Sequence, residues 1–308
     1  MFKSLFSRKG PAGLCGLQIQ GGNLLLAFVS GAGERIALDC CEVLEAGDSW
    51  SGRAELLAQK VRESGLAQAR CNLVLTPEQY QLFMMEAPKV PAEELREAVK
   101  WKVKDLVSEP LDQVVIDVMS LADDCGRAGQ RLIYAVVAKR EFIEAAIALV
   151  EKSGLVLESI DIDEMAVRNL GVRLAADKRG VALVVLRQGQ GSLALVKEQQ
   201  LYLSRSFTIN YAGGLLDDIP EEALILELQR SFDYYERQLG QVPPATIVLM
   251  GEHVTSDKLQ GQLADAFGAQ VQTLDIARWL EDNERYDELV LQQCASALGA
   301  ALRSEEAV

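Results

Sequence analysis

Two stretches of the chain share one order of elements and decide its fold. The first is LCGLQIQGGNLLLAFVSGAGERIALDCCEVL, residues 14–44, and the second is GVALVVLRQGQGSLALVKEQQLYLSRSFTI, residues 180–209. Glycine-containing turns separate apolar, strand-like runs in both. The expected strands are 14–20, 23–29 and 35–44 in the first stretch, and 180–187, 192–197 and 200–209 in the second.

Each stretch is followed by a predicted helix and a further apolar strand. These are residues 51–64 and 72–75 in the first half, and 220–239 and 246–250 in the second. The repeat is too long for a solenoid, so the pattern predicts an α/β protein with two lobes of one topology. We expect a basic tail at 1–11, a first lobe at 12–77 with 161–179, an inserted αβ subdomain at 78–160, a second lobe at 180–303 and an acidic tail at 304–308.

Composition and charge exclude several classes of protein. The 308 residues are 49% hydrophobic and 25% charged, which is typical of a globular chain, and the net charge is −14. That charge repels phosphate backbones, so we expect no nucleic-acid partner. No apolar run approaches the roughly 18 residues of a membrane span, and the start, MFKSLFSRKG, lacks the features of a secretory signal. The six cysteines form no C-x-x-C pair, so we expect reduced thiols, no metal site and a cytoplasmic location.

The segment between the two repeats carries the motifs of a known family. LTPEQYQLFMMEAPKVPAEELREAVKWKVKDLVSEPLDQVVIDVMSL, residues 75–121, resembles the insertion of PilM/MshI-type pilus biogenesis proteins, which belong to the FtsA/PilM branch of the actin-like superfamily. That insertion has a P-x-x-E-L-x-x-A-I/V-x-W/R helix followed by a P-L-x-x-V-x-x-D strand. The matching residues are Pro91, Glu94, Leu95, Ala98, Val99, Trp101, Pro110, Leu111, Val114 and Asp117.

The resemblance covers nearly the whole chain. GLVLESIDIDEMAVRNL (154–170), LELQRSFDYYERQLGQVPPATIVLMGE (226–252) and SALGAALR (296–303) are similar to other segments of the same family. The run WKVKDLV at 101–107 is most similar to the MshI subgroup of the mannose-sensitive haemagglutinin (MSHA) pilus. The resemblance implies a bilobed actin-like, ribonuclease-H-like α/β fold with an αβ insertion in the first lobe.

The nucleotide motifs of the superfamily are degraded. Actin-like ATPases bind Mg-nucleotide between the lobes through Asp-x-Gly motifs and glycine hairpins, because phosphate needs close backbone N–H groups and magnesium needs carboxylates. Residues 16–20 read GLQIQ, with Gln18 at the aspartate position, and 185–187 read VLR. We therefore expect little or no ATP hydrolysis and no cofactor, with Mg-ATP disfavoured. The degenerate nucleotide-binding candidates are Gln18, Gly21, Gly22, Arg187, Gly189 and Gly251; Arg187 is either a phosphate contact or a solvated turn residue.

Other reactive side chains do not form a catalytic motif. His253 is the only histidine, and no nucleophile motif such as G-x-S-x-G accompanies it. Asp161, Asp163 and Glu164 could be an acid/base pair, but favourable charge at a helix start explains them more simply. We expect no catalytic residue.

The resemblance implies a protein partner. In PilM-type proteins a groove beside the insertion receives the short cytoplasmic tail of the inner-membrane protein PilN, and the corresponding face here contains Pro88, Val90, Trp101 and Leu106. A pilus assembly ATPase is a second expected partner, and membrane association would occur through the PilN-like protein. The N-terminal residues Phe2, Leu5 and Phe6, with three basic neighbours, would be a marginal lipid contact or a frayed end.

The leading hypothesis is therefore a pilus scaffold without ATPase activity. A working actin-like ATPase and the cytoplasmic part of a type II secretion L-like component are the alternatives.

Overall fold

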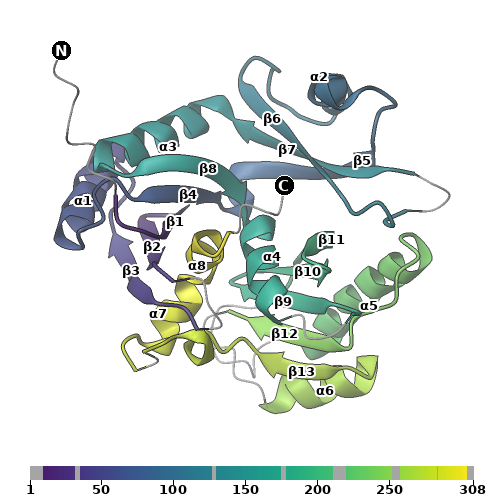
Figure 1. Ribbon diagram of the computed structural model, residues 1–308. Helices are drawn as coiled ribbons and strands as arrows, with labels where there is room; N and C mark the ends of the chain where they lie inside the picture. Colours follow the sequence, from purple (N-terminus) through teal and green to yellow (C-terminus); the bar gives the residue numbers. More distant parts are fainter. Residues whose placement is uncertain are drawn as a thin grey trace. The chain divides into compact units, whose positions relative to one another are not determined.

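A computed structural model describes residues 10–31, 35–126, 130–174, 178–210, 220–251, 257–282 and 284–303. The chain forms two compact units (Figure 1). The first unit contains residues up to Thr76, Glu141–Ala166 and Ile276–Arg303, and the second contains Pro77–Arg140 and Val167–Asp275. None of the helices among the described residues is long and apolar enough to cross a membrane.

The first unit is built on a five-stranded sheet in the order β3-β2-β1-β4-β8. The strands β1, β2 and β3 form an antiparallel meander, whereas β4 and β8 run parallel to β1. Their bounds are β1 Leu14–Gln20, β2 Asn23–Val29, β3 Leu38–Glu45, β4 Arg70–Leu75 and β8 Val156–Ile162.

Two helices and the sheet share the core of this unit. The helix α1 (Trp50–Glu63) begins after Ser49, whose side chain accepts a hydrogen bond from the Gly52 amide, and α3 spans Arg140–Ser153. Leu57 of α1 and Leu149 of α3 are buried in one cluster with Leu17, Leu24 and Leu73 of the sheet. The alternating apolar residues of the strands therefore find partners on both helices.

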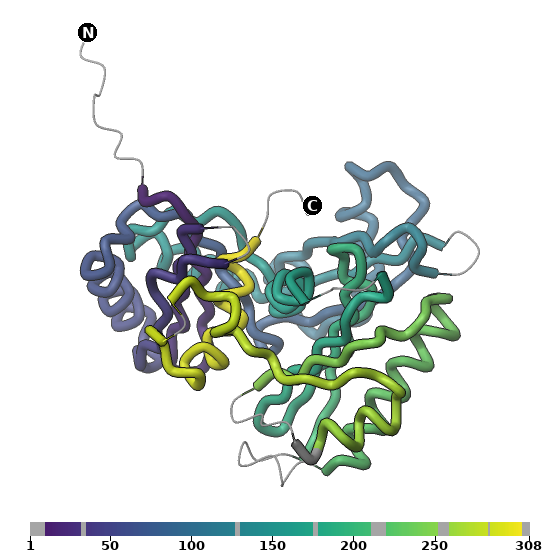
Figure 2. The backbone as a smooth tube through the Cα atoms, turned by 60° about the horizontal axis from the view of Figure 1, so that its bottom comes forward, coloured from purple at the N-terminus to yellow at the C-terminus, as the bar shows by residue number. Residues whose placement is uncertain are grey.

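The C-terminal segment also belongs to the first unit (Figure 2). It contains the turn η3 (Ala277–Trp279) and the helices α7 (Glu288–Gln293) and α8 (Ala295–Ala301), and all seven residues of α8 are buried. The helix approaches β1 so closely that a Cβ atom on Gly16 would lie 1.7 Å from the carbonyl oxygen of Ala297. Glycine is therefore required at position 16 for α8 to pack here.

The second unit contains a sheet of the same topology, in the order β11-β10-β9-β12-β13. The helix α5 (Glu221–Arg237) packs its buried Leu228 and Phe232 inward, and the Phe232 ring contacts Phe267 of α6 (Asp257–Phe267) edge to face at 5.1 Å. The strands are β9 Val181–Arg187, β10 Gln190–Lys197, β11 Gln200–Thr208, β12 Thr246–Met250 and β13 Gln270–Thr273.

A smaller antiparallel sheet, in the order β5-β7-β6, completes the second unit. It follows the turn η1 (Pro77–Gln79), and its strands are β5 Tyr80–Glu86, β6 Val114–Ser120 and β7 Leu132–Lys139. The helix α2 (Ala92–Val103) covers one face and buries Val99 and Val103 against Ile133, Ala135 and Val137. We call residues 77–140 the insertion.

The structure places three boundaries differently from the sequence-based expectation. The expected subdomain 78–160 ends near residue 140, because β8 pairs with β4 of the first sheet and α3 packs in the first core. Residues 276–303 pack with the first unit and not with the second lobe. The helix α4 (Asp163–Leu174) contributes to both units, with residues from Val167 onward in the second.

Candidate functional site

The first-unit candidates lie on β1 and its turn to β2. Gln20 pairs with Asn23 across the turn, and Gly21 has a φ of +53°, the left-handed conformation that glycine favours. Gly22 is open enough for an ordinary side chain, since the atoms nearest to a Cβ there are 3.6 Å or more away. The expected tight hairpin is present, but only Gly21 is required by its backbone.

Arg53 holds this hairpin in place. Its Nη2 donates to the Gly21 carbonyl oxygen at 2.5 Å and its Nε to the Gly47 carbonyl oxygen at 2.8 Å, while the guanidinium lies 5.3 Å from the Trp50 ring centroid. The side chain is almost fully buried. This role cannot be predicted from the sequence, because a basic residue inside a predicted helix gives no sign that it reaches a turn 32 positions earlier.

Gln18 is engaged with a carboxylate. Its side chain is 2% exposed, and Nε2 donates to Oδ1 of Asp163, itself 3% exposed, at 3.3 Å. The same oxygen accepts a hydrogen bond of 2.7 Å from Ser296 Oγ of α8. An amide nitrogen facing a carboxylate is a hydrogen-bond donor and cannot ligate a cation. The residue at this position therefore does not fit the metal-binding role of the actin-like aspartate.

A second polar cluster joins α8 to β8 in the same unit. Arg303 Nη1 lies 2.6 and 2.7 Å from the two carboxylate oxygens of Asp161 and 2.9 Å from Ser159 Oγ. Asn72 accepts from Ser159 Oγ and donates to the Ala300 carbonyl oxygen. Asp161 and Asp163 thus both bind donors from the C-terminal segment. These contacts favour a structural interpretation of the acidic cluster over an acid/base pair.

The second-unit candidates meet at one edge of their sheet. Arg187 ends β9, and Gly251 follows β12, which pairs in parallel with β9 through Met250 and Val185. Gly189 has a φ of +72° in the two-residue turn to β10, and Gly251 has a φ of +144°. The structure therefore brings Arg187, Gly189 and Gly251 to neighbouring strand ends. His253 and its neighbour Glu252 lie outside the described residues.

The partner-face candidates lie along one segment of the insertion. Pro88 and Val90 are half-buried in the turn before α2, where the Val90 amide donates to the Pro88 carbonyl oxygen. Trp101 is 61% exposed on α2, and Leu106 is 54% exposed just beyond its end. These are two of the most exposed large apolar side chains among the described residues. The N-terminal candidates Phe2, Leu5 and Phe6 lie outside the described residues.

The thiols are buried and reduced. All six cysteines are free, and burial raises the pKa of Cys71 to about 12. A thiol with that pKa is a poor nucleophile at neutral pH. Within the described ranges, no three His, Cys, Asp or Glu side chains converge on a point that could hold a metal ion.

Comparisons with known proteins identify the fold. No protein-family model matches the sequence, and no curated protein matches it significantly. The structure is similar to a chain of the PilM-PilN type IV pilus biogenesis complex, with a TM-score of 0.68 and 22% identity over 95% of this chain and 98% of that chain.

Two further structures are similar at lower identity. A Bacteroides thetaiotaomicron protein of unknown function with an actin-like ATPase fold gives a TM-score of 0.53 and 11% identity over 92% of this chain and 97% of that one. The cytoplasmic domain of EpsL, an inner-membrane component of the type II secretion system of Vibrio cholerae, gives a TM-score of 0.53 and 10% identity over 94% of this chain and 95% of that one. The chain has the actin-like α/β fold, which confirms the predicted fold class.

Proposed function

We propose that this protein is a scaffold of type IV pilus biogenesis, of PilM/MshI type, which binds the cytoplasmic tail of a PilN-like inner-membrane protein at the cytoplasmic face of the membrane. The observation that carries the proposal is the fold similarity to a chain of the PilM-PilN complex over 95% of the chain, which includes the insertion. The finer assignment to the MshI subgroup and the MSHA pilus rests on the run WKVKDLV alone. Contact with an assembly ATPase belongs to the same proposal.

The outer face of α2 is the surface that we assign to the tail, together with Pro88 and Val90. The inner face of α2 contacts the insertion core through Val99 and Val103, so Trp101 projects from the opposite face, and Leu106 is exposed just beyond the end of the helix. Lys104 Nζ lies 5.7 Å from the centroid of the Trp101 ring. An exposed tryptophan is the residue type that most often dominates the free energy of a protein interface.

Electrostatics favours the same class of partner. Cytoplasmic segments beside a membrane helix carry an excess of Lys and Arg. A chain with a net charge of −14 attracts such a tail at long range and accelerates its association. We therefore expect the association rate to fall as salt is added.

Binding of a fluorescent tail peptide tests this proposal. The peptide carries the cytoplasmic tail of the PilN-like protein of the same organism, and binding is measured by fluorescence anisotropy. Trp101→Ala should weaken binding at least tenfold. Val242→Ala, at a 64% exposed apolar side chain elsewhere in the second unit, is the matched control and should have no effect. Absence of binding at high micromolar peptide, or equal loss in both variants, would contradict the proposal.

We also propose that the protein does not hydrolyse ATP. This rests on Gln18, whose amide binds Asp163 where an actin-like ATPase would need a free carboxylate. Thermal shift with Mg-ATP, together with phosphate release, tests this part independently of the peptide. A saturable rise in Tm accompanied by turnover would favour the alternative of a working ATPase. Binding to a type II secretion partner in place of the pilus peptide would favour the L-like alternative. The TM-score with the EpsL domain, 0.53, is lower than the 0.68 with the chain of the PilM-PilN complex.

A further inference from the structure

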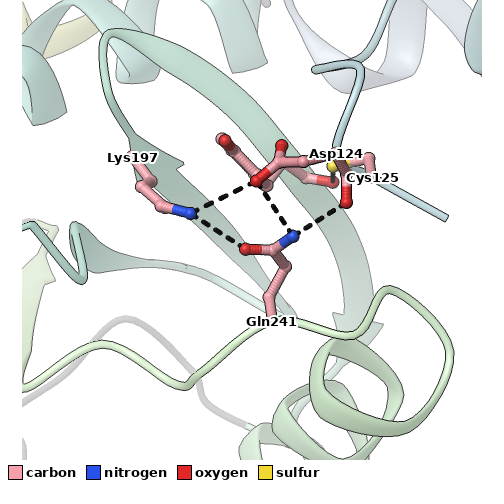
Figure 3. A network of polar contacts seen from close by, with 5 residues as sticks. Asp124, Cys125, Lys197 and Gln241 are labelled. Carbon is pink, nitrogen blue, oxygen red and sulfur yellow. Dashed lines mark hydrogen bonds and ion pairs between the residues drawn. The ribbon is translucent and has the colours of Figure 1, made fainter.

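A polar network joins the loop after β6 to the five-stranded sheet of the second unit, which we call the second sheet (Figure 3). Lys197 Nζ, at the end of β10, lies 3.4 Å from Asp124 Oδ2 and donates to Gln241 Oε1 at 3.0 Å. Gln241 Nε2 donates in turn to the Asp124 carbonyl oxygen at 2.9 Å and to its Oδ2 at 3.3 Å. Three segments that are distant in the sequence therefore meet at one carboxylate.

Tyr202 adds a third donor to this carboxylate. Tyr202 has no residue opposite it on β10, because the pairing of β10 with β11 shifts register there: Leu195 pairs with Leu203, and Val196 pairs with Leu201. Its hydroxyl hydrogen-bonds to Asp124, and Lys197 Nζ lies 5.0 Å from its ring centroid. Burial alone would raise the pKa of Asp124, but the contacts with Tyr202, Lys197 and Gln241 outweigh it and lower that pKa.

A second contact closes the edge of β11. The Tyr134 hydroxyl, on β7 of the insertion, accepts a hydrogen bond of 2.8 Å from the Ser204 amide and donates to the Ser204 carbonyl oxygen at 3.3 Å. Cys125 Sγ donates to the Tyr202 carbonyl oxygen at 4.0 Å. β11 is an edge strand, so these outward backbone groups have no strand partner, and the insertion satisfies them.

The loop is partly packed, with Asp123 and Asp124 exposed at its surface. Leu121, Ala122 and Cys125 are buried, although connecting segments usually lie on the surface in water. We call Asp124, Tyr134, Lys197, Tyr202 and Gln241 the docking latch. Its residues lie in the loop after β6, on β7, on β10, on β11 and in the segment after α5, so several separate parts of the second unit contribute to it.

We infer that the docking latch makes the insertion a fixed arm of the second sheet, so that a ligand held on α2 also stabilises β10 and β11. The first half of this inference concerns the free protein. The second half, in which the ligand is the partner tail, rests on the proposed function. A unit as small as the insertion, residues 77–140, buries a limited share of its own surface and is marginal by itself, which is why its docking onto β11 should set its stability.

Hydrogen exchange of the full chain, measured by mass spectrometry, tests the first half. Tyr134→Phe and Gln241→Leu should each raise exchange about fivefold to tenfold in β5, β7 and β11, the range expected for one or two lost hydrogen bonds. Exchange in β1, β2 and β4 should not change. Tyr286→Phe is the matched control, because that hydroxyl donates to the Leu38 carbonyl oxygen in the first unit; it should affect only the β3 region.

Two results would overturn the inference in the free protein. One is unchanged exchange in β5 and β7 in both latch variants, which would show that the insertion is stable without docking. The other is faster exchange confined to the amide of Ser204, which merely loses its own acceptor.

The tail peptide then tests the second half. Protection that extends from α2 into β10 and β11 in the wild type, and is reduced by Gln241→Leu, supports coupling. Protection that stops at the insertion contradicts coupling while leaving the proposed function intact. Absence of any protection contradicts the proposed partner, whereas the exchange of the free protein still decides whether the latch holds.

Discussion

Gln18→Glu should destabilise the first unit in a pH-dependent way. The two side chains have nearly the same shape, so the new carboxylate oxygen would occupy the place of Nε2, 3.3 Å from the Asp163 carboxylate. Both positions are almost fully buried, so solvent cannot screen the repulsion. At an effective dielectric constant of about 20, two charges this close repel by about 5 kcal/mol.

Protonation limits the loss. A glutamate with an ordinary pKa of about 4.3 costs about 1.4 kcal/mol per pH unit to protonate, which is about 3.7 kcal/mol at pH 7 and about 1 kcal/mol at pH 5. Since this is below the repulsion, the folded variant should take up a proton and donate it to Asp163. Its folded-state pKa is then raised, so the loss of stability is full above that pKa and disappears as the pH falls towards about 4.3.

Thermal unfolding followed by circular dichroism measures this effect. At pH 7 the variant should melt roughly 10 °C below the wild type, and at pH 5 only about 3 °C below. Gln18→Leu is the control: it removes the donor without adding charge, so its loss should be similar at both pH values. Equal stability of Gln18→Glu and wild type at pH 7, or a loss that does not change with pH, would refute the role that we assign to the amide of Gln18.

Three further predictions concern packing and charge. Gly16→Val should cost at least about 3 kcal/mol in chemical denaturation because α8 would have to shift, whereas Gly261→Ala, where a Cβ meets nothing within 4 Å, should stabilise α6 by up to about 1 kcal/mol. Asp161→Asn should cost about 1–3 kcal/mol, against less than about 1 kcal/mol for Glu158→Gln in an exposed pair; similar losses would contradict the anchoring of the C-terminal segment. The contacts that lower the pKa of Asp124 stabilise the fold above the ordinary pKa of an aspartate, and this contribution is lost as the pH falls through the folded value. The protection of β11 from hydrogen exchange, taken relative to the intrinsic exchange rate at each pH, should therefore fall in acid for the wild type and not for Asp124→Asn.

Local pattern sufficed for most of the strands. The predicted bounds 14–20, 23–29 and 246–250 coincide with β1, β2 and β12, because each strand is a short apolar run between turn or breaker residues. The third strand was predicted from residue 35 but begins at Leu38, since Ile36 instead pairs with Leu280. No local pattern around Ile36 predicts that it pairs with a residue more than two hundred positions away.

The placement of elements was harder to predict than the elements themselves. The helix α3 and most of β8 fall within the expected subdomain 78–160, and only the parallel pairing of β8 with β4 assigns this strand to the sheet of the first unit. In the second sheet, α6 and β13 occupy the positions that α3 and β8 occupy in the first. A repeat that included one more helix and one more strand in each half would therefore have predicted the place of β8. The roles of Arg53 and Gln18 depend in the same way on side chains that approach from distant segments.

The first unit is built from three segments that are separated in the sequence, and this affects the order in which the chain folds during synthesis. The segment Ile276–Arg303 supplies the wholly buried α8, so the part of the sheet that α8 contacts stays uncovered until this segment leaves the ribosome. At about 5–20 residues per second, that delay lasts tens of seconds, during which an apolar sheet is open to chaperones or to aggregation. Stalled nascent chains of increasing length should therefore acquire protease resistance in the second unit first; early resistance of β1 and β2 would contradict this order.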